Sequence, residues 1–165
     1  MTPQRLEDLV GELSNRRGSR RLRAREALVE IGAPAVPALL PLAASPSKQL
    51  RWEATKTLGA IADLRAVPAL VERLADSESG IRWLAAVGLV SLGPAAIPPA
   101  LRAVIARPDS QDLRRAVHHV LHDLTHDNPD LVEIISPVLA ALRDIEPADA
   151  IPPKAQEALQ RLESL

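Results

Sequence analysis

The chain has 165 residues, 20 Lys and Arg, 21 Asp and Glu, and a net charge of −1. This length fits one ordinary domain, and the balanced charge argues against a protein that holds nucleic acid through bulk charge. The chain contains no Cys, Phe or Tyr and only 2 Trp. That composition excludes disulfides and thiolate chemistry, and it leaves almost no aromatic platform for single-stranded nucleic acid.

Apolar residues recur at steps of three and four along the whole chain, which predicts helices and no strands. The predicted helices span residues 3–14, 20–31, 35–43, 47–61, 66–75, 78–92, 96–106, 110–125, 130–142 and 153–163. No apolar run reaches the roughly 20 residues that a bilayer span requires. The first residues carry acidic side chains and no uninterrupted apolar stretch, unlike a signal peptide. We therefore expect no membrane segment and a cytoplasmic location.

Four segments align without gaps, at residues 21–32, 51–62, 82–93 and 114–125, and each begins with Arg. A small or apolar residue follows three positions after the Arg, and another apolar residue follows after ten. A leucine stands seven positions after each Arg, at Leu28, Leu58, Leu89 and Leu121. These steps place all the repeated residues on one helical face, so we predict that they form the core.

A second element follows each of these helices. Residues 35–43, 66–75 and 96–106 begin with Ala-Val-Pro or Ala-Ile-Pro. A proline in the first helical turn costs no hydrogen bond, so each unit is predicted to be a helix A, a short turn and a helix B. The fourth helix B, at 131–142, lacks the early proline. The helices at 3–14 and 153–163 are predicted to cap the array, the latter with the pattern of a helix A.

The pattern Arg-x-x-Ala-x-x-Ala-Leu-x-x-Ile-Gly, then Ala-Val-Pro-x-Leu, resembles the HEAT-repeat family. It is most similar to the short HEAT-like repeat of phycobilin lyases. The resemblance implies an all-α, right-handed solenoid of about four helix pairs, with helices A on the convex side and helices B on the concave side. One domain is expected over residues 1–165, with a cap helix and loop at 1–18, four repeats at 19–142 and a cap helix at 143–165.

In this family the concave side usually binds the ligand, which implies a binding stripe on the helices B. The predicted protein-binding residues are Leu42, Glu72, Arg73, Arg102 and Ser136. The stripe is mixed in character, which suits a protein or peptide better than phosphate. The alternative is that these residues are ordinary solvated positions. The sequence contains no catalytic motif. We therefore expect a non-catalytic scaffold or adaptor, not an enzyme, that binds another protein and needs no cofactor.

Two other functions stay open as alternatives. The segment from Arg16 to Arg25 holds six Arg in ten residues. Arg forms bidentate pairs with phosphate and carboxylate, so the segment suits nucleic acid or an acidic partner. We favour a charged first helical turn whose arginines pair with Glu26 and Glu30. The other alternative is an enzyme subunit that resembles bilin lyases, although no residue stands out as a chromophore contact.

Every histidine lies between His118 and His126. His118 and His122 stand four residues apart, so their rings could share a metal ion. At 100° per residue, however, His119, His122 and His126 lie opposite the predicted core face. We therefore expect an exposed cluster and no metal site.

Trp52 and Trp83 each follow the repeated Arg directly. We interpret them as anchors that pack across the boundary between units, and the alternative is an exposed binding ladder. The repeated residues Arg51, Arg82 and Arg114 are expected to bond the carbonyls or carboxylates of the preceding loop. The candidate carboxylates are Asp76, Glu78 and Asp109.

Overall fold

A computed structural model describes residues 3–143 and 147–164, and the regular elements in these ranges are all helical. The α-helices are α1 Pro3–Glu12, α2 Gly18–Ile31, α3 Val36–Ala43, α4 Lys48–Ile61, α5 Val67–Arg73, α6 Ser79–Leu92, α7 Ile97–Ala106, α8 Gln111–Thr125, α9 Pro129–Leu142 and α10 Ile151–Leu162. Each predicted helix is confirmed with its ends within two residues of those observed.

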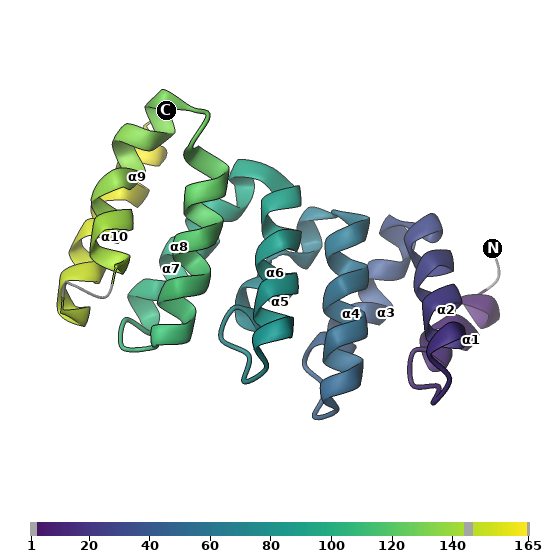
Figure 1. Ribbon diagram of the computed structural model, residues 1–165. Coiled ribbons are helices and arrows are strands. Elements are labelled where there is room, and N and C mark those ends of the chain that lie inside the picture. Colours follow the sequence, from purple (N-terminus) through teal and green to yellow (C-terminus); the bar gives the residue numbers. More distant parts are fainter. Residues whose placement is uncertain (1–2, 144–146, 165) are drawn as a thin grey trace.

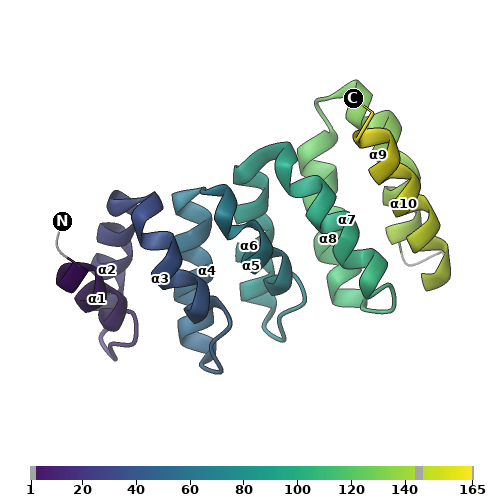
Figure 2. The same cartoon turned by 180° about the vertical axis from the view of Figure 1, so that it is seen from behind.

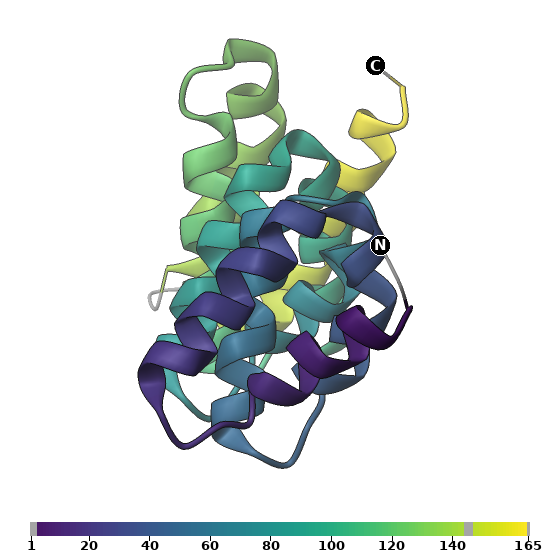
Figure 3. The same cartoon turned by 90° about the vertical axis from the view of Figure 1, so that its right-hand side faces the viewer.

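The helices form two layers of a solenoid. One layer, here called the A layer, contains α2, α4, α6, α8 and α9, and lies toward the viewer in Figure 1. The B layer contains α1, α3, α5, α7 and α10 and is seen from its own side in Figure 2. Figure 3 looks along the array from its N-terminal end and shows the helices stacked one behind another. The predicted all-α solenoid is therefore confirmed.

The turn from an A helix into a B helix follows the same course in the first three pairs. The backbone takes a positive φ at Gly32 (70°), Ala62 (54°) and Gly93 (76°), where glycine is the least strained residue. A short 3-10 turn follows, at Ala33–Ala35, Leu64–Ala66 and Gly93–Ala96. A proline then stands in the first turn of each B helix. This geometry sends each B helix back antiparallel to its A helix.

The repeated leucines form the centre of the core, as predicted. Leu28, Leu58, Leu89 and Leu121 all have an exposed fraction of 0%. The small residues of the same face allow the helices to approach closely. Between α4 and α6, a Cβ atom built on Gly88 would lie 2.9 Å from the Cα atom of Gly59, so only hydrogen fits there. The A layer therefore has a tightly packed centre.

The last two helices, α9 and α10, do not lie in the layers that their order in the chain predicts. The helix α9 was expected as the second helix of a fourth pair, but it packs beside α8 in the A layer. The B-layer place next to α7 is taken by α10, which was expected to be a cap with the helix A pattern. The sequence carries a signal for this arrangement, because Ile151-Pro152-Pro153 repeats the Ile97-Pro98-Pro99 start of α7. A 3-10 turn at Ala148–Ala150 also precedes α10, as one precedes each earlier helix B.

One segment, Ser79–Ala106, is long and apolar enough to pass a test for a membrane span by length and composition alone. It consists of α6, a 3-10 turn and α7, and these two helices lie in different layers. Of its most apolar stretch, 44% is buried inside the fold.

Candidate binding groove

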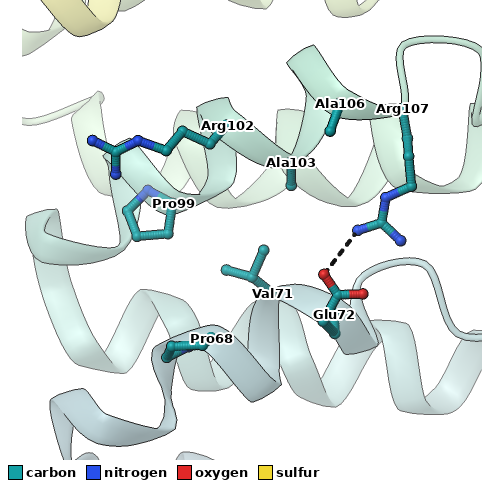
Figure 4. A pocket seen from close by; sticks show the side chains of 8 residues that line it. All are labelled: Pro68, Val71, Glu72, Pro99, Arg102, Ala103, Ala106 and Arg107. Carbon is teal, nitrogen blue, oxygen red and sulfur yellow. Dashed lines mark hydrogen bonds and ion pairs between the residues drawn. The ribbon is translucent and has the colours of Figure 1, made fainter.

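A groove opens on the B layer between α5 and α7. It has a volume of about 390 Å³. Its lining residues come from facing sides of the two helices and are Pro68, Val71, Glu72, Pro99, Arg102, Ala103, Ala106 and Arg107. Figure 4 shows the apolar members between the helices and the charged members toward the rim. We call this feature the α5–α7 groove.

The helix starts explain the apolar part of the α5–α7 groove. Pro68 and Pro99 stand in the first turns of α5 and α7, where a missing N–H is tolerated. Their rings lie at the same end of the groove in Figure 4. Val71 and Ala103, one turn further along, are 6% and 7% exposed and form the floor. Small alanines on α7 leave the space that a larger side chain would fill.

The rim of the groove is mixed in charge with a positive excess. The Nη2 atom of Arg107 lies 3.3 Å from Oε1 of Glu72, in an ion pair whose side chains are 38% and 61% exposed. A pair this exposed contributes little to stability. Arg102 points away from this pair (Figure 4) and makes no ion pair within the part of the chain that the structure describes. The groove therefore combines an apolar floor with an available guanidinium, which suits a ligand with an apolar body and a carboxylate.

The structure brings two of the predicted binding residues together and separates the other three. Glu72 and Arg102 both line the α5–α7 groove. Leu42 is half-buried against the core. Arg73 turns to the neighbouring loop, where its Nη1 atom donates to Oδ2 of Asp76 at 3.1 Å. Ser136 lies on α9 in the A layer, and its hydroxyl donates to the carbonyl of Val132. The five residues therefore do not form one continuous stripe.

A row of arginines, here called the arginine ladder, joins successive units at the loops before the A helices. The Nη1 atoms of Arg21, Arg51 and Arg82 each donate to the carbonyls five and six residues earlier, at 2.8–3.2 Å. The predicted bonds to the preceding loop are therefore present. The same guanidinium groups also reach forward to a carboxylate of the next unit, at Glu53, Asp76 and Asp112 respectively.

The candidate carboxylate Asp76 pairs with Arg51 of the unit before it and gives Arg82, the Arg that follows it, only its backbone carbonyl. Glu78 pairs with Lys48, with Oε2 and Nζ 2.6 Å apart. The carboxylates that pair with Arg21 and Arg82 are Glu53 and Asp112, which belong to the following helix A and were not among the candidates. Arg114, the last repeated Arg, donates to the carbonyls of Ala141 and Arg143 at the C-terminal end of α9. The antiparallel packing of α9 on α8 places those carbonyls within its reach.

Asp76 is the most enclosed carboxylate of the ladder, with a side-chain exposure of 2%. Burial opposes its ionisation, but the hydrogen bond from Arg51, the backbone N–H of Glu78 and the charges of Arg51 and Arg73 outweigh this effect. The pKa of Asp76 therefore lies below its ordinary value. This carboxylate ties two arginines of α4 and α5 to the loop before α6.

The Arg16–Arg25 segment is divided between structural bonds and exposed charge. Arg21 and Arg25 both bind the buried Glu53, at 2.8 and 2.6 Å, and not Glu26 or Glu30 as expected. Arg20 reaches back to Glu12 at 3.4 Å. Arg16 and Arg17 are exposed in the turn before α2. The densest cationic stretch of the sequence therefore supplies only a small free patch.

The histidines stack along α8. The ring centroids of His118 and His122 lie 6.3 Å apart, and those of His122 and His126 lie 5.9 Å apart. Burial lowers the pKa of His118, and the charges of Arg143, His122 and His119 act in the same direction. His119, His122 and His126 are exposed, as their phase predicts. Over residues 3–143 and 147–164, no three His, Asp or Glu residues are grouped to hold a metal ion.

The sequence matches the family of HEAT repeats over residues 6–89 and 36–122, which together span well over half of the chain. The chain therefore belongs to the HEAT-repeat family. It is also similar to a solved structure, the complex of CpcE and CpcF of phycocyanin lyase from Nostoc sp. PCC7120. That match has 27% identity and a TM-score of 0.66, and covers 95% of this chain and 99% of the other. No curated protein sequence matches the chain.

The similarity corrects the expectation that the chain is not an enzyme. A chain that resembles it over nearly its whole length belongs to a lyase complex, so the absence of a recognisable catalytic motif was a poor guide. Motifs such as a nucleophile elbow or a metal-binding helix mark particular chemistries only. An enzyme that acts by holding two reactants in place leaves no such mark in one chain.

Proposed function

We propose that this chain is a subunit of a lyase-type enzyme that works in a complex with a second protein chain. The observation that carries the proposal is the likeness to phycocyanin lyase, which extends over the full array and not over a single repeat. By analogy, its substrate class is a bilin, an open-chain tetrapyrrole with an apolar conjugated body and propionate carboxylates.

The α5–α7 groove supports this substrate class. Its apolar floor, formed around Val71 and Ala103, fits a flat conjugated body, and Arg102 stands at the rim to pair with a carboxylate. The volume of about 390 Å³ is within the range of small-molecule sites. The groove is open along one side, so a second protein that covers it would complete the enclosure.

The proposal is tested by whether the chain forms a complex with a chain of the known lyase and whether that complex forms product. The purified chain is mixed separately with CpcE and with CpcF of Nostoc, each with phycocyanin apoprotein and a bilin. Sedimentation measures the complex, and visible absorbance after denaturation measures covalently bound chromophore. We expect a complex and coloured product with at least one of the two chains, and no product from this chain alone. Neither complex nor product with either chain would contradict the proposal.

A further inference from the structure

The three charged side chains of the α5–α7 groove are divided unequally between its two ends. Arg102 extends toward the end that carries Pro99, whereas Glu72 and Arg107 meet at the opposite end (Figure 4). Arg102 and Arg107 stand five residues apart in the sequence, which places their Cα atoms about 7 Å apart along the direction of α7. The groove therefore has two separate places that could receive an anionic group.

The two ends differ in the charge that they offer to a ligand. Arg102 is exposed and forms no ion pair within the described part of the chain. Arg107 is already engaged by Glu72, the single carboxylate among the described residues that line the groove. The carbonyl end of α7, which finishes at Ala106, adds partial negative charge beside this pair. A carboxylate is therefore favoured at Arg102 and disfavoured at Arg107.

The pair of Glu72 and Arg107 sets the charge of the groove but contributes little to the fold. It joins α5 to the residue after α7 through one contact of 3.3 Å, and its side chains are 61% and 38% exposed. Ion pairs that are this accessible to water add little stability. The carboxylate of Asp76, by contrast, is 2% exposed and binds two arginines. Substitution of Glu72 should therefore change the charge of the groove and leave the fold intact.

We propose that Glu72 makes the α5–α7 groove selective for ligands that place a single carboxylate in it, with that carboxylate at Arg102. This inference rests on the proposed function in taking the groove as the ligand site. A second carboxylate at the far end would compete with Glu72 for Arg107 and would meet a like charge there, which disfavours such a ligand. Of the propionates of a bilin, one would enter the groove and the other would stay outside it.

The probes are 2-naphthoate and 2,6-naphthalenedicarboxylate, which share one flat apolar body and carry one and two carboxylates. Their binding to the full chain is followed by the fluorescence of the probe. We expect the parent to bind the monocarboxylate more tightly than the dicarboxylate. Glu72→Gln should tighten binding of the dicarboxylate about fivefold, the change expected of a charged pair at an exposed rim, and should affect the monocarboxylate much less.

Two further variants test whether the gain comes from Arg107. The double variant Glu72→Gln, Arg107→Gln should lose the gain, because the guanidinium that receives the second carboxylate is then absent. Glu133→Gln removes an exposed carboxylate that pairs with Arg161 elsewhere on the array, and it should change neither affinity.

Equal affinity of the parent for the two probes, no binding of either probe, or no gain with Glu72→Gln would each overturn the inference. The probes need neither a partner chain nor a covalent step, so the result does not depend on the lyase assay. A negative lyase assay together with the expected probe affinities would contradict the proposed function and not the selectivity of the groove.

Discussion

At the scale of single residues, the units are joined by arginines that bond in two directions. The guanidinium of Arg51 closes the loop before its own helix through two carbonyls and holds Asp76 of the next loop through two nitrogen atoms. A guanidinium is suited to this because its donors form a fixed planar fork that is always charged. Such a bond fixes the spacing of successive units, which apolar contacts alone specify less sharply.

Asp76→Asn should lower the free energy of unfolding by on the order of 3 kcal/mol at neutral pH, because two largely buried arginines lose their counter-charge. The control Asp112→Asn removes a carboxylate that is 52% exposed and should cost less than about 1 kcal/mol. Urea unfolding of the three proteins measures the difference. Equal costs for the two variants would show that burial of the pair is unimportant.

The ionisation of Asp76 also predicts how the stability of the fold depends on pH. The pKa of Asp76 is lower in the folded than in the unfolded chain. Its ion pairs therefore stabilise the fold at pH values above the ordinary carboxyl pKa of about 3.9. This stability is lost as the pH falls through the lower, folded-state pKa. The gap in melting temperature between the parent and Asp76→Asn should therefore be constant near neutrality and narrow below about pH 4. A gap that widens in acid would contradict the assignment.

At the scale of elements, the core depends on leucines at the centre of each A helix and on glycines where A helices meet. Leu89 has no exposed surface and belongs to α6, which packs against both α4 and α8. Leu58 holds the same place on α4. The tight contact of Gly59 with Gly88 sets the distance between these two helices.

Leu89→Ala should lower the free energy of unfolding by about 2–5 kcal/mol, and Leu58→Ala by a similar amount, because each leaves a cavity in a packed core. Thermal and urea unfolding measure the loss. A Leu89→Ala protein that melts within about a degree of the parent would show that the assigned face is wrong, since even about 1 kcal/mol shifts the midpoint by several degrees.

Gly88→Ala should destabilise the chain by about 1–3 kcal/mol, because the added methyl would lie 2.9 Å from the backbone of α4. Gly80→Ala is the matched control in the first turn of the same helix, where nothing lies within 4 Å of the new methyl. That change should be neutral or stabilising by up to about 1 kcal/mol, since alanine favours helix. Equal effects at the two positions would refute the proposed close contact.

Much of the fold follows from the sequence because each unit repeats a strong helical pattern. The positions of Leu28 to Leu121 and the prolines of the B helices determine the elements without any tertiary information. Order along the chain does not show that α9 lies beside α8 and α10 beside α7, because it does not fix the order of helices in space. The decisive signal was the Ile151-Pro152-Pro153 start of α10, a helix B signature at a place expected to hold a cap.

The candidate site was less predictable, for a physical reason. Helical phase places Glu72 and Arg102 on the outer face of their helices, and both do line the groove. Phase cannot show where a long side chain finds its counter-charge, and Arg73 turns to Asp76 in a loop. Helical phase also cannot show that Trp52 and Trp83, which hold the same position in successive repeats, differ in exposure. The ring of Trp52 is covered partly by Arg25 of another helix, whereas Trp83 is 60% exposed.

At the scale of the whole molecule, the two layers present different surfaces. The B layer carries the α5–α7 groove with its apolar floor and cationic rim, and the A layer carries the exposed Trp83. An extended array of this kind can hold more than one partner along its length. The likeness to a lyase complex then concerns the arrangement of the entire chain and not one motif.

Arg73 and Arg102, both predicted to be binding residues, should have different effects when they are substituted. Arg102→Glu should leave the melting temperature unchanged and weaken ligand binding in the groove, because its guanidinium is exposed at the rim. Arg73→Glu should instead lower the melting temperature, since it places a second carboxylate beside Asp76. The double variant Arg16→Glu, Arg17→Glu should affect neither property. If Arg73→Glu weakens binding without loss of stability, the residue belongs to the binding surface after all.

We propose that the α5–α7 groove holds the substrate of a lyase-type complex. The most direct measurement is bilin titration of the assembled complex, followed by visible absorbance, for the parent, Arg102→Glu and the control Arg23→Glu on the A layer. Loss of a charged hydrogen bond to a carboxylate should raise the Kd of Arg102→Glu about tenfold or more, with the control unchanged. Equal affinity in all three proteins, or no bilin binding by the parent complex, would contradict the account.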